Sequence, residues 1–247
     1  MWFLLLFLTY ATLLSIALSR AGLRLGPAPL PTPSGPPPAR VLVVGATGGT
    51  GRQLVSQALE RGYVVTALAR RASRLKLEHP NLAKVDVNVL DAAVLDAVLR
   101  GQDAVLCALG HRRYGGPTTI LSQGTRNLLR AMEAHGVRRL VCETSLGIGD
   151  SAFRMGLVYT FFNIPIVLPF YFWDKTRQER AIAASRVEWV IVRPGALTNR
   201  PKRGAYRHGR VGSFFWTVRI SRADVAEFML DQLTEDTHLG TAVGVSG

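Results

Sequence analysis

Residues 40–71 have the sequence RVLVVGATGGTGRQLVSQALERGYVVTALARR, and this stretch decides the fold. The apolar run Val41–Val44 is typical of a buried parallel strand, and the glycine-rich loop GATGGTG follows it. An amphipathic pattern then predicts a helix that ends at Gly62, and Tyr63–Ala69 has the composition of a second strand. A strand, a glycine-rich turn, a helix and a strand within about 30 residues predict a dinucleotide-binding βαβ unit.

Three glycines give the physical reason for this prediction. Gly45 allows the tight turn, Gly48 lets a diphosphate approach the main chain, and Gly51 lets the helix lie close to the strand. The free N–H groups at the start of the helix are donors for the anion. A glycine-rich turn without a ligand is the alternative, and the two flanking strands and the helix favour a cofactor site.

The second strand ends in Arg70 and Arg71, and no acidic residue stands at its tip. An acid there would accept hydrogen bonds from the ribose of NAD and repel a 2′-phosphate, whereas arginine attracts that phosphate. The sequence therefore predicts NADP(H) as the cofactor. For Arg71, an ordinary solvated surface charge stays open as the alternative.

The composition fits one core: the chain has 247 residues, of which 48% are hydrophobic. A net charge of +13 often marks a nucleic-acid-binding protein. The sequence has no helix-turn-helix pattern, zinc-ligand spacing or aromatic-interleaved basic stripe, so we expect neither nucleic acid nor a metal. A cationic surface near anionic lipid headgroups explains the charge better. Cys107 and Cys142 lie in apolar runs, which indicates core positions and a reducing cytosolic compartment.

The N-terminus predicts a membrane anchor. Trp2–Leu18 is a charge-free stretch of 17 residues, near the lower limit for crossing a bilayer. Arg20 and Arg24 follow it, so the positive-inside rule puts the rest of the chain on the cytoplasmic face. We expect an anchor over residues 1–19, and a proline-rich linker over residues 20–39 that holds the domain off the membrane. A single nucleotide-binding domain would then occupy residues 40–247.

The remainder of the chain alternates strands and helices. This alternation predicts an α/β fold with a doubly wound parallel sheet, the Rossmann fold. The further strands are expected at Ala83–Val89, Ala104–Leu109, Arg139–Glu143, Glu188–Val192 and Ala242–Ser246. The further helices are expected at Asp91–Leu99, Thr118–Ala134, Asp174–Ala184 and Ser221–Leu233, with Asp174 and Ser221 as N-caps.

Met155–Trp173 is a second stretch without charge, 19 residues long. Its length makes it a transmembrane candidate, but Pro165 and Pro169 argue against a straight helix. A span here would also put the two halves of the sheet on opposite sides of the membrane. We expect instead a wall or lid of an apolar substrate pocket, which can dip into the bilayer surface.

These motifs resemble the atypical short-chain dehydrogenase/reductases with an NAD(P)H-binding domain, and most of all the flavin reductase/biliverdin IXβ reductase group. The resemblance runs from Arg40 to the C-terminus through VLVVGATGGTGRQLV, TSLGIGDS, DKTRQERAIAASRVEWVIVRPG and ISRADVAEFMLDQL. It implies a cofactor site made by Gly45, Thr47, Gly48, Gly49, Thr50, Gly51, Arg70, Asn88, Ala108, Leu109, Gly110, Thr144, Lys175, Pro194 and Gly195. Asn88 stands where the family usually has an Asp beside the adenine.

The same resemblance implies a catalytic set. Short-chain dehydrogenases use Tyr-x-x-x-Lys and a serine, and Tyr171, Lys175 and Ser145 match this pattern. Positions four apart share one face of a helix, and the lysine would lower the tyrosine pKa. Tyr171 precedes the expected N-cap Asp174, however, so it can equally be an aromatic lining of an apolar pocket.

Three functions fit the sequence. The first is an NADPH-dependent reductase that transfers hydride to an apolar or planar acceptor such as a quinone, flavin, tetrapyrrole or lipid carbonyl. The second is a non-catalytic NADP(H)-binding sensor or scaffold. The third, an NADP-dependent isomerase or epimerase, is disfavoured because the chain leaves little room for an additional substrate domain.

Overall fold

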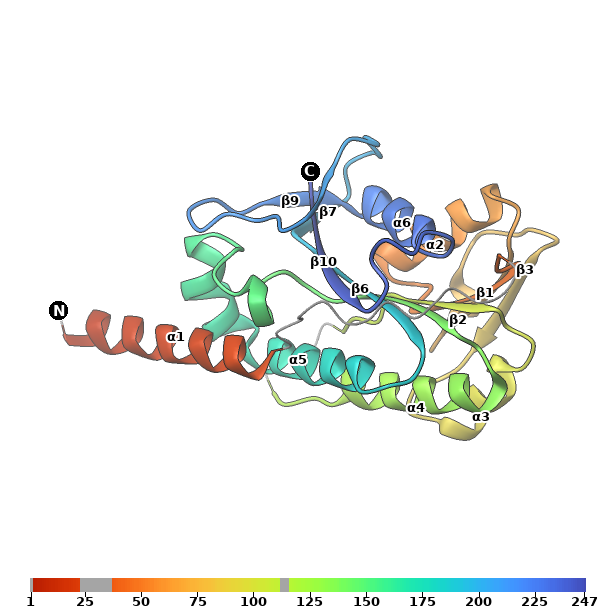
Figure 1. Cartoon of the computed structure of the whole chain (residues 1–247), viewed down its shortest axis with the longest axis horizontal. Coiled ribbons are helices and arrows are strands. Elements are labelled where there is room, and N and C mark those ends of the chain that lie inside the picture. Colours follow the sequence, from red (N-terminus) through yellow and green to blue (C-terminus); the bar gives the residue numbers. More distant parts are fainter. Residues whose placement is uncertain (1, 23–36, 112–115) are drawn as a thin grey trace.

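An eight-stranded, mostly parallel sheet forms the centre of the molecule in the computed structural model, which describes residues 2–22, 37–111 and 116–247 (Figure 1). The strand order is β3-β2-β1-β4-β5-β6-β10-β8, with β8 antiparallel to β10. The strands are β1 (Arg40–Val44), β2 (Val64–Ala69), β3 (Leu82–Asp86), β4 (Ala104–Cys107), β5 (Arg139–Glu143), β6 (Glu188–Pro194), β8 (Arg207–Gly209) and β10 (Thr241–Ser246). Two further strands, β7 (Ala196–Thr198) and β9 (Arg219–Ser221), pair with each other. The predicted doubly wound fold is confirmed.

Helices cover both faces of the sheet. On one face α2 (Gly49–Glu60) and α6 (Arg222–Asp231) bury apolar side chains, and on the other α3 (Ala92–Leu99), α4 (Ile120–His135) and α5 (Pro169–Ala183) do the same (Figure 1). Because both faces are covered, the central strands are apolar throughout: Val41–Val44 is fully buried. The strand order reverses between β1 and β4, and ligands of such sheets bind at this reversal.

The predicted N-cap at Asp174 is wrong, because α5 begins five residues earlier, at Pro169. Proline is favoured in the first turn of a helix, where its missing N–H costs nothing. The buried Asp174 carboxylate caps another helix instead: it accepts hydrogen bonds from the main-chain N–H groups of Leu121 (2.9 Å) and Ser122 (3.1 Å) at the start of α4. The predicted cap at Ser221 is confirmed, since its Oγ accepts from the N–H of Asp224 at 3.0 Å.

The N-terminal helix α1 (Trp2–Ala21) packs directly on the domain. Within the described residues it is the one helix long and apolar enough to cross a membrane. Its buried positions Ala11, Ser15 and Leu18 lie on one face, and Leu18 packs in a small apolar cluster with Ile148, Ile164 and Phe172. Arg20 and Ala21 are helical rather than linker, and most of the proline-rich stretch lies outside the described residues.

The uncharged stretch Met155–Trp173 is not one straight helix. It contains the π-helical segment η3 (Tyr159–Val167) and the first turn of α5, separated at Leu168. Pro165 lies inside η3, and a proline has no N–H to donate and clashes with the preceding turn, which explains the departure from α-helical geometry.

Candidate cofactor and active site

A cavity of about 600 Å³ opens at the carboxyl ends of β1, β2, β4 and β5, where the strand order reverses. Twenty-four of the residues that the structure describes line it. Those that the sequence predicted as site residues are Gly45, Thr47, Gly48, Gly49, Thr50, Arg70, Asn88, Ala108, Leu109, Gly110, Thr144, Tyr171 and Lys175. The tertiary structure thus brings together residues spread over 130 positions of the chain, from Gly45 to Lys175.

The glycine-rich loop has the close approaches that require glycine. Gly45 has a φ of +83°, and a Cβ atom on it would lie 2.5 Å from the carbonyl oxygen of Ala108. A Cβ on Gly51 would lie 2.1 Å from the carbonyl oxygen of Gly45, so only glycine lets α2 sit this close to β1. The N-cap of α2 is Gly48, and no side chain caps this helix. The first main-chain N–H groups of α2 therefore remain as donors for a ligand at the wall of the cavity.

Replacing Gly51 by alanine is expected to destabilise the protein by about 1–3 kcal/mol, because the added methyl group meets main-chain atoms that cannot rotate away. Gly116→Ala is the control, since no atom of the described residues lies within 4 Å of a Cβ there. Denaturant unfolding of both variants measures the difference. Equal stability of the two would contradict the close helix–strand contact.

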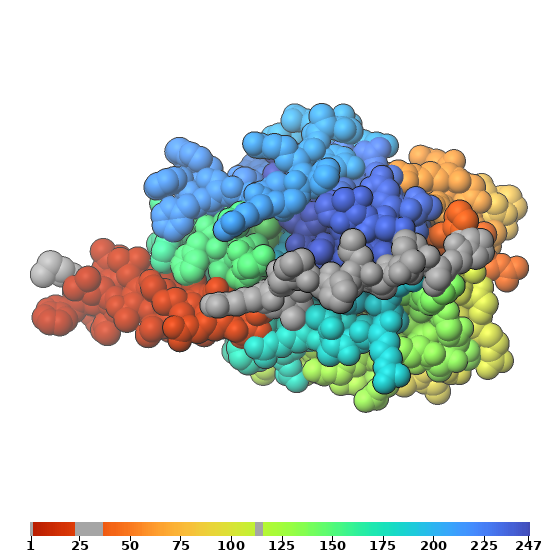
Figure 2. Space-filling model, in the orientation of Figure 1, coloured from red at the N-terminus to blue at the C-terminus, as the bar shows by residue number. Residues whose placement is uncertain are grey.

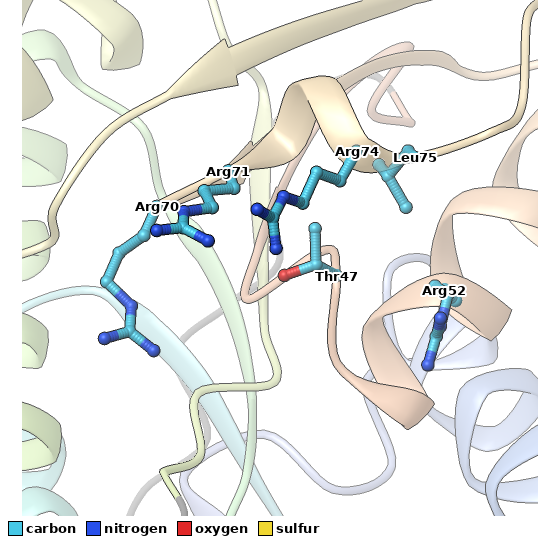
Figure 3. Close-up of a pocket in the computed structure, with 6 residues that line it drawn as sticks. All are labelled: Thr47, Arg52, Arg70, Arg71, Arg74 and Leu75. Carbon is cyan, nitrogen blue, oxygen red and sulfur yellow. The ribbon is translucent and has the colours of Figure 1, made fainter.

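Four arginines surround a second cavity of about 730 Å³ that adjoins the first and shares Thr47, Arg52 and Arg70 with it. Arg70 and Arg71 follow β2, Arg74 belongs to the short turn η1 (Ala72–Arg74), and Arg52 comes from α2. Figure 3 shows Arg74 reaching toward Thr47, with Arg71 beside it and Arg52 on the helix across the cavity. The sequence left open whether Arg71 contributes to the cofactor site or is a solvated surface charge, and in the structure Arg71 lines a cavity.

The turn that presents Arg74 is fixed by an acid. The carboxylate of Asp86, at the end of β3, accepts hydrogen bonds from the main-chain N–H (2.8 Å) and the hydroxyl (2.9 Å) of Ser73. These bonds lower the pKa of Asp86, so its carboxylate stays charged. The spacing Arg70, Arg71, Arg74 was visible in the sequence, but the turn that folds the third arginine back was not.

Lys175 is fully buried beside the cavity. Its Nζ donates hydrogen bonds to the main-chain oxygens of Leu109 (3.1 Å) and Glu143 (2.8 Å), at the ends of β4 and β5. An ammonium has three N–H groups, so one is left for a ligand after these two contacts with the described residues. Burial by itself lowers the pKa of Lys175, but the Coulombic interactions with Tyr171, Cys142 and Glu143 outweigh burial and raise this pKa above its usual value, so the group stays protonated.

Tyr171 lies on α5, one turn before Lys175, as the Tyr-x-x-x-Lys pattern requires. Its ring centroid is 5.8 Å from the Lys175 Nζ and 5.0 Å from that of His111. The hydroxyl lies 3.8 Å from the position of a Cβ on Gly110, which puts it over the cavity wall. The early start of α5 thus makes Tyr171 helical, contrary to the expected boundary.

Besides Arg52, two charged residues at the cavity, Glu143 and Arg222, were missed from the sequence. The buried carboxylate of Glu143 accepts a hydrogen bond from the Thr50 hydroxyl at 3.0 Å. Burial raises the pKa of Glu143, and Lys175 and Thr50 oppose that rise. The Arg222 side chain lies against Gly49 and donates to the Asn199 side chain at 2.7 Å. The sequence did offer a signal for both: Glu143 ends a predicted strand and Arg222 begins a predicted helix.

Some predicted residues lie elsewhere. Ser145, Gly51, Pro194 and Gly195 are not among the residues that line either cavity. The Ser145 hydroxyl donates to the carbonyl oxygen of Leu146 at 2.9 Å. Its neighbour Thr144 does line the cavity, but its hydroxyl donates to the buried Glu179 at 2.7 Å. The predicted tyrosine and lysine therefore meet at the site, and the predicted serine does not.

A family model described as NAD(P)H-binding matches residues 45–236. The chain belongs to the NAD(P)H-binding family. This NAD(P)H-binding protein is 33% identical over 207 residues to an uncharacterized chloroplastic protein of Arabidopsis thaliana, covering 80% of this chain and 72% of that one. It is 28% identical over 213 residues to a (4-alkanoyl-5-oxo-2,5-dihydrofuran-3-yl)methyl phosphate reductase of Streptomyces griseus, covering 84% and 67%.

The solved structures similar to this NAD(P)H-binding protein include a short-chain dehydrogenase/reductase from Veillonella parvula in complex with NADP. That match has a TM-score of 0.70 at 18% identity and covers 85% of this chain and 95% of the other. It supports the fold. The sequence-level resemblance to atypical short-chain dehydrogenase/reductases is confirmed, and the family match supports an oxidoreductase type.

Proposed function

We propose that this NAD(P)H-binding protein is an NADPH-dependent reductase that delivers hydride to an apolar or planar acceptor. The observation that carries the proposal is the meeting of Tyr171 and Lys175 on one helix at the cofactor cavity. The reductase among its relatives supports the reaction type.

The cavity residues fit NADPH. The N–H groups of Thr47–Gly51 at the start of α2 would hold the pyrophosphate, and Asn88 would face the adenine. The arginine-lined cavity, with Arg70 shared between both cavities, would take the 2′-phosphate. Thr144 and Lys175 would then lie toward the nicotinamide end, with Ala108–Gly110 along the ribose. The neighbour solved with NADP agrees with this preference.

The roles of the protein groups follow from chemistry. Bound NADPH supplies a hydride, and reduction of a carbonyl or conjugated acceptor also needs a proton at the developing anion. The Tyr171 hydroxyl would donate that proton. The Lys175 ammonium, held by two main-chain oxygens, would stabilise the tyrosinate left behind and bind the ribose. Ile120, Leu197 and the ring of Tyr171 give the cavity an apolar side for the acceptor, which we expect to be a quinone, flavin, tetrapyrrole or lipid carbonyl.

One observation favours a second candidate, a non-catalytic NADP(H)-binding sensor or scaffold. Ser145, the expected partner of the tyrosine, is directed to the Leu146 carbonyl and lines neither cavity. Such a protein would bind the nucleotide and show no acceptor-dependent oxidation. The isomerase or epimerase has no observation of this kind in its favour.

We further propose that α1 attaches the protein to the membrane with the domain on the cytoplasmic face. NADPH is available there, and an apolar acceptor dissolved in the bilayer would be within reach.

Oxidation of NADPH by the full-length protein with a panel of quinones and flavins tests the reductase. Tyr171→Phe is expected to lower kcat about 100-fold or more, because general acid catalysis contributes that much. NADPH affinity should change less than about threefold, since the hydroxyl acts on the acceptor. Tyr63→Phe, a half-buried tyrosine outside both cavities, is the matched control.

Two results would count against this mechanism. Full activity of Tyr171→Phe would show that Tyr171 is not the proton donor, although the protein would still be a reductase. NADPH binding without turnover for any acceptor in the panel would favour the non-catalytic protein.

A further inference from the structure

One end of the molecule exposes apolar side chains from three chain segments. The N-terminal half of α1, Trp2–Tyr10, projects there, and we call it the free half of α1. The outer face of η3 exposes Phe162. The loop before β9 exposes Phe215 by 66% and Trp216 by 78%. Figures 1 and 2 show the three segments side by side at the end that carries the N-terminus. We call this surface, made by Trp2–Tyr10, the exposed face of η3 and Phe214–Trp216, the apolar end.

Contacts join these segments into one surface. The rings of Phe7 and Phe162 lie 5.3 Å apart, and the Tyr10 hydroxyl approaches the carbonyl oxygen of Pro165 at 3.5 Å. On the other side of η3, the N–H of Gly156 donates to the carbonyl oxygen of Ser213 at 2.8 Å, next to the aromatic loop. The three segments are therefore held in fixed relation to each other.

The docking of α1 limits how far it can reach into a membrane. Its face from Ala11 to Leu18 is covered by the domain, so the part that projects is Trp2–Tyr10, which contacts η3 through Phe7 and Tyr10. At 1.5 Å per residue this free part is about 14 Å long, about half of the 30 Å hydrocarbon core. To span the bilayer, α1 would have to separate from the domain and expose Leu18, Ile148, Ile164 and Phe172.

Charge identifies the surface that the apolar end fits. No charged residue occurs from Val211 to Val218 or from Met155 to Trp173, and the exposed arginines Arg210 and Arg219 flank the aromatic loop. Aromatic side chains bounded by arginine are typical of the interface of a bilayer that contains anionic lipid.

We propose that this protein is monotopic: the free half of α1, the face of η3 and Phe214–Trp216 insert together into the cytoplasmic leaflet of an anionic bilayer. The domain then lies on the membrane rather than hanging from a spanning helix. The insertion goes beyond the proposed reaction and is tested without turnover.

Tryptophan quenching tests the aromatic loop. Full-length Trp2→Phe/Trp173→Phe retains Trp216 and Trp189, which is 8% exposed in β6. In phosphatidylcholine–phosphatidylglycerol vesicles with brominated acyl chains we expect strong quenching, which Trp216→Phe in the same background should abolish. Equal quenching of the two variants would overturn the proposal. An unquenched Trp216 together with a dimer in cross-linking would assign the apolar end to a second copy of the chain, which also overturns it.

Cysteine labelling tests the half-span. Phe3→Cys adds one exposed thiol, whereas Cys107 and Cys142 are buried. Membrane-impermeant maleimide applied to intact cells should leave the Phe3→Cys protein unlabelled, and detergent should then make it reactive. Labelling from outside intact cells would show a spanning α1 and overturn the monotopic arrangement. Neither readout depends on NADPH oxidation, so a failed reductase and a failed insertion are distinguishable.

Discussion

Replacing Arg70 by glutamate is expected to weaken NADPH binding about 100-fold or more, because a hydrogen bond to a charged group contributes about 1.5–3 kcal/mol and the new carboxylate repels the 2′-phosphate. NADH has no 2′-phosphate, and its affinity should fall less than about threefold. Arg70 lines both cavities and so lies between the adenosine part of the site and the arginine cluster.

Binding titrations of both nucleotides measure this prediction. Arg100→Glu is the control, because it makes the same charge change at an exposed arginine. Arg100 precedes β4 and so lies at the amino ends of the strands, whereas the cavities lie at their carboxyl ends. Arg74→Glu tests the arginine that only the fold places at the cavity, and it should also weaken NADPH more than NADH. Equal losses of NADPH and NADH in Arg70→Glu would remove the argument for phosphate selection.

Replacing Glu179 by alanine is expected to destabilise the protein by about 3–5 kcal/mol, because it removes the buried carboxylate that pairs with the buried Arg193 guanidinium and leaves it the more exposed Asp150. The Glu179 carboxylate accepts hydrogen bonds from Arg193 Nε at 2.9 Å and Nη2 at 2.7 Å, and both side chains are almost completely buried. Arg193 also pairs with Asp150, and Thr144 donates to Glu179. This network anchors the cavity residue Thr144 to β6 and α5.

Denaturant unfolding measures the loss. Glu60→Ala, at an exposed glutamate on α2, should change stability by no more than about 0.5 kcal/mol. A double variant, Glu179→Leu/Arg193→Met, should be more stable than Glu179→Ala, since it also removes the buried guanidinium that has lost the Glu179 carboxylate. If Glu179→Ala unfolds at the same denaturant concentration as Glu60→Ala, the ion pair contributes nothing to stability.

Local sequence was enough for the first half of the site. The turn at Gly45, the opening of α2 and the close approach of Gly51 depend on main-chain geometry over a few residues, so a glycine pattern predicts them. The buried parallel strands follow from short apolar runs, and β5 has the predicted bounds, Arg139–Glu143. Arg70 was predictable because it directly follows such a strand.

Long-range packing decided the rest. Asp174 has the composition of a cap, but the choice between α5 and α4 depends on which helix end lies beside it in space. Arg52 and Arg74 line one cavity only because α2 and η1 fold over it, and the Ser145 hydroxyl turns to a neighbouring carbonyl. The same holds for α1. Its apolar sequence was enough to predict a helix that avoids water. How far this helix can extend into a membrane depends on the face that packs against Ile148, Ile164 and Phe172, and these residues are distant in sequence.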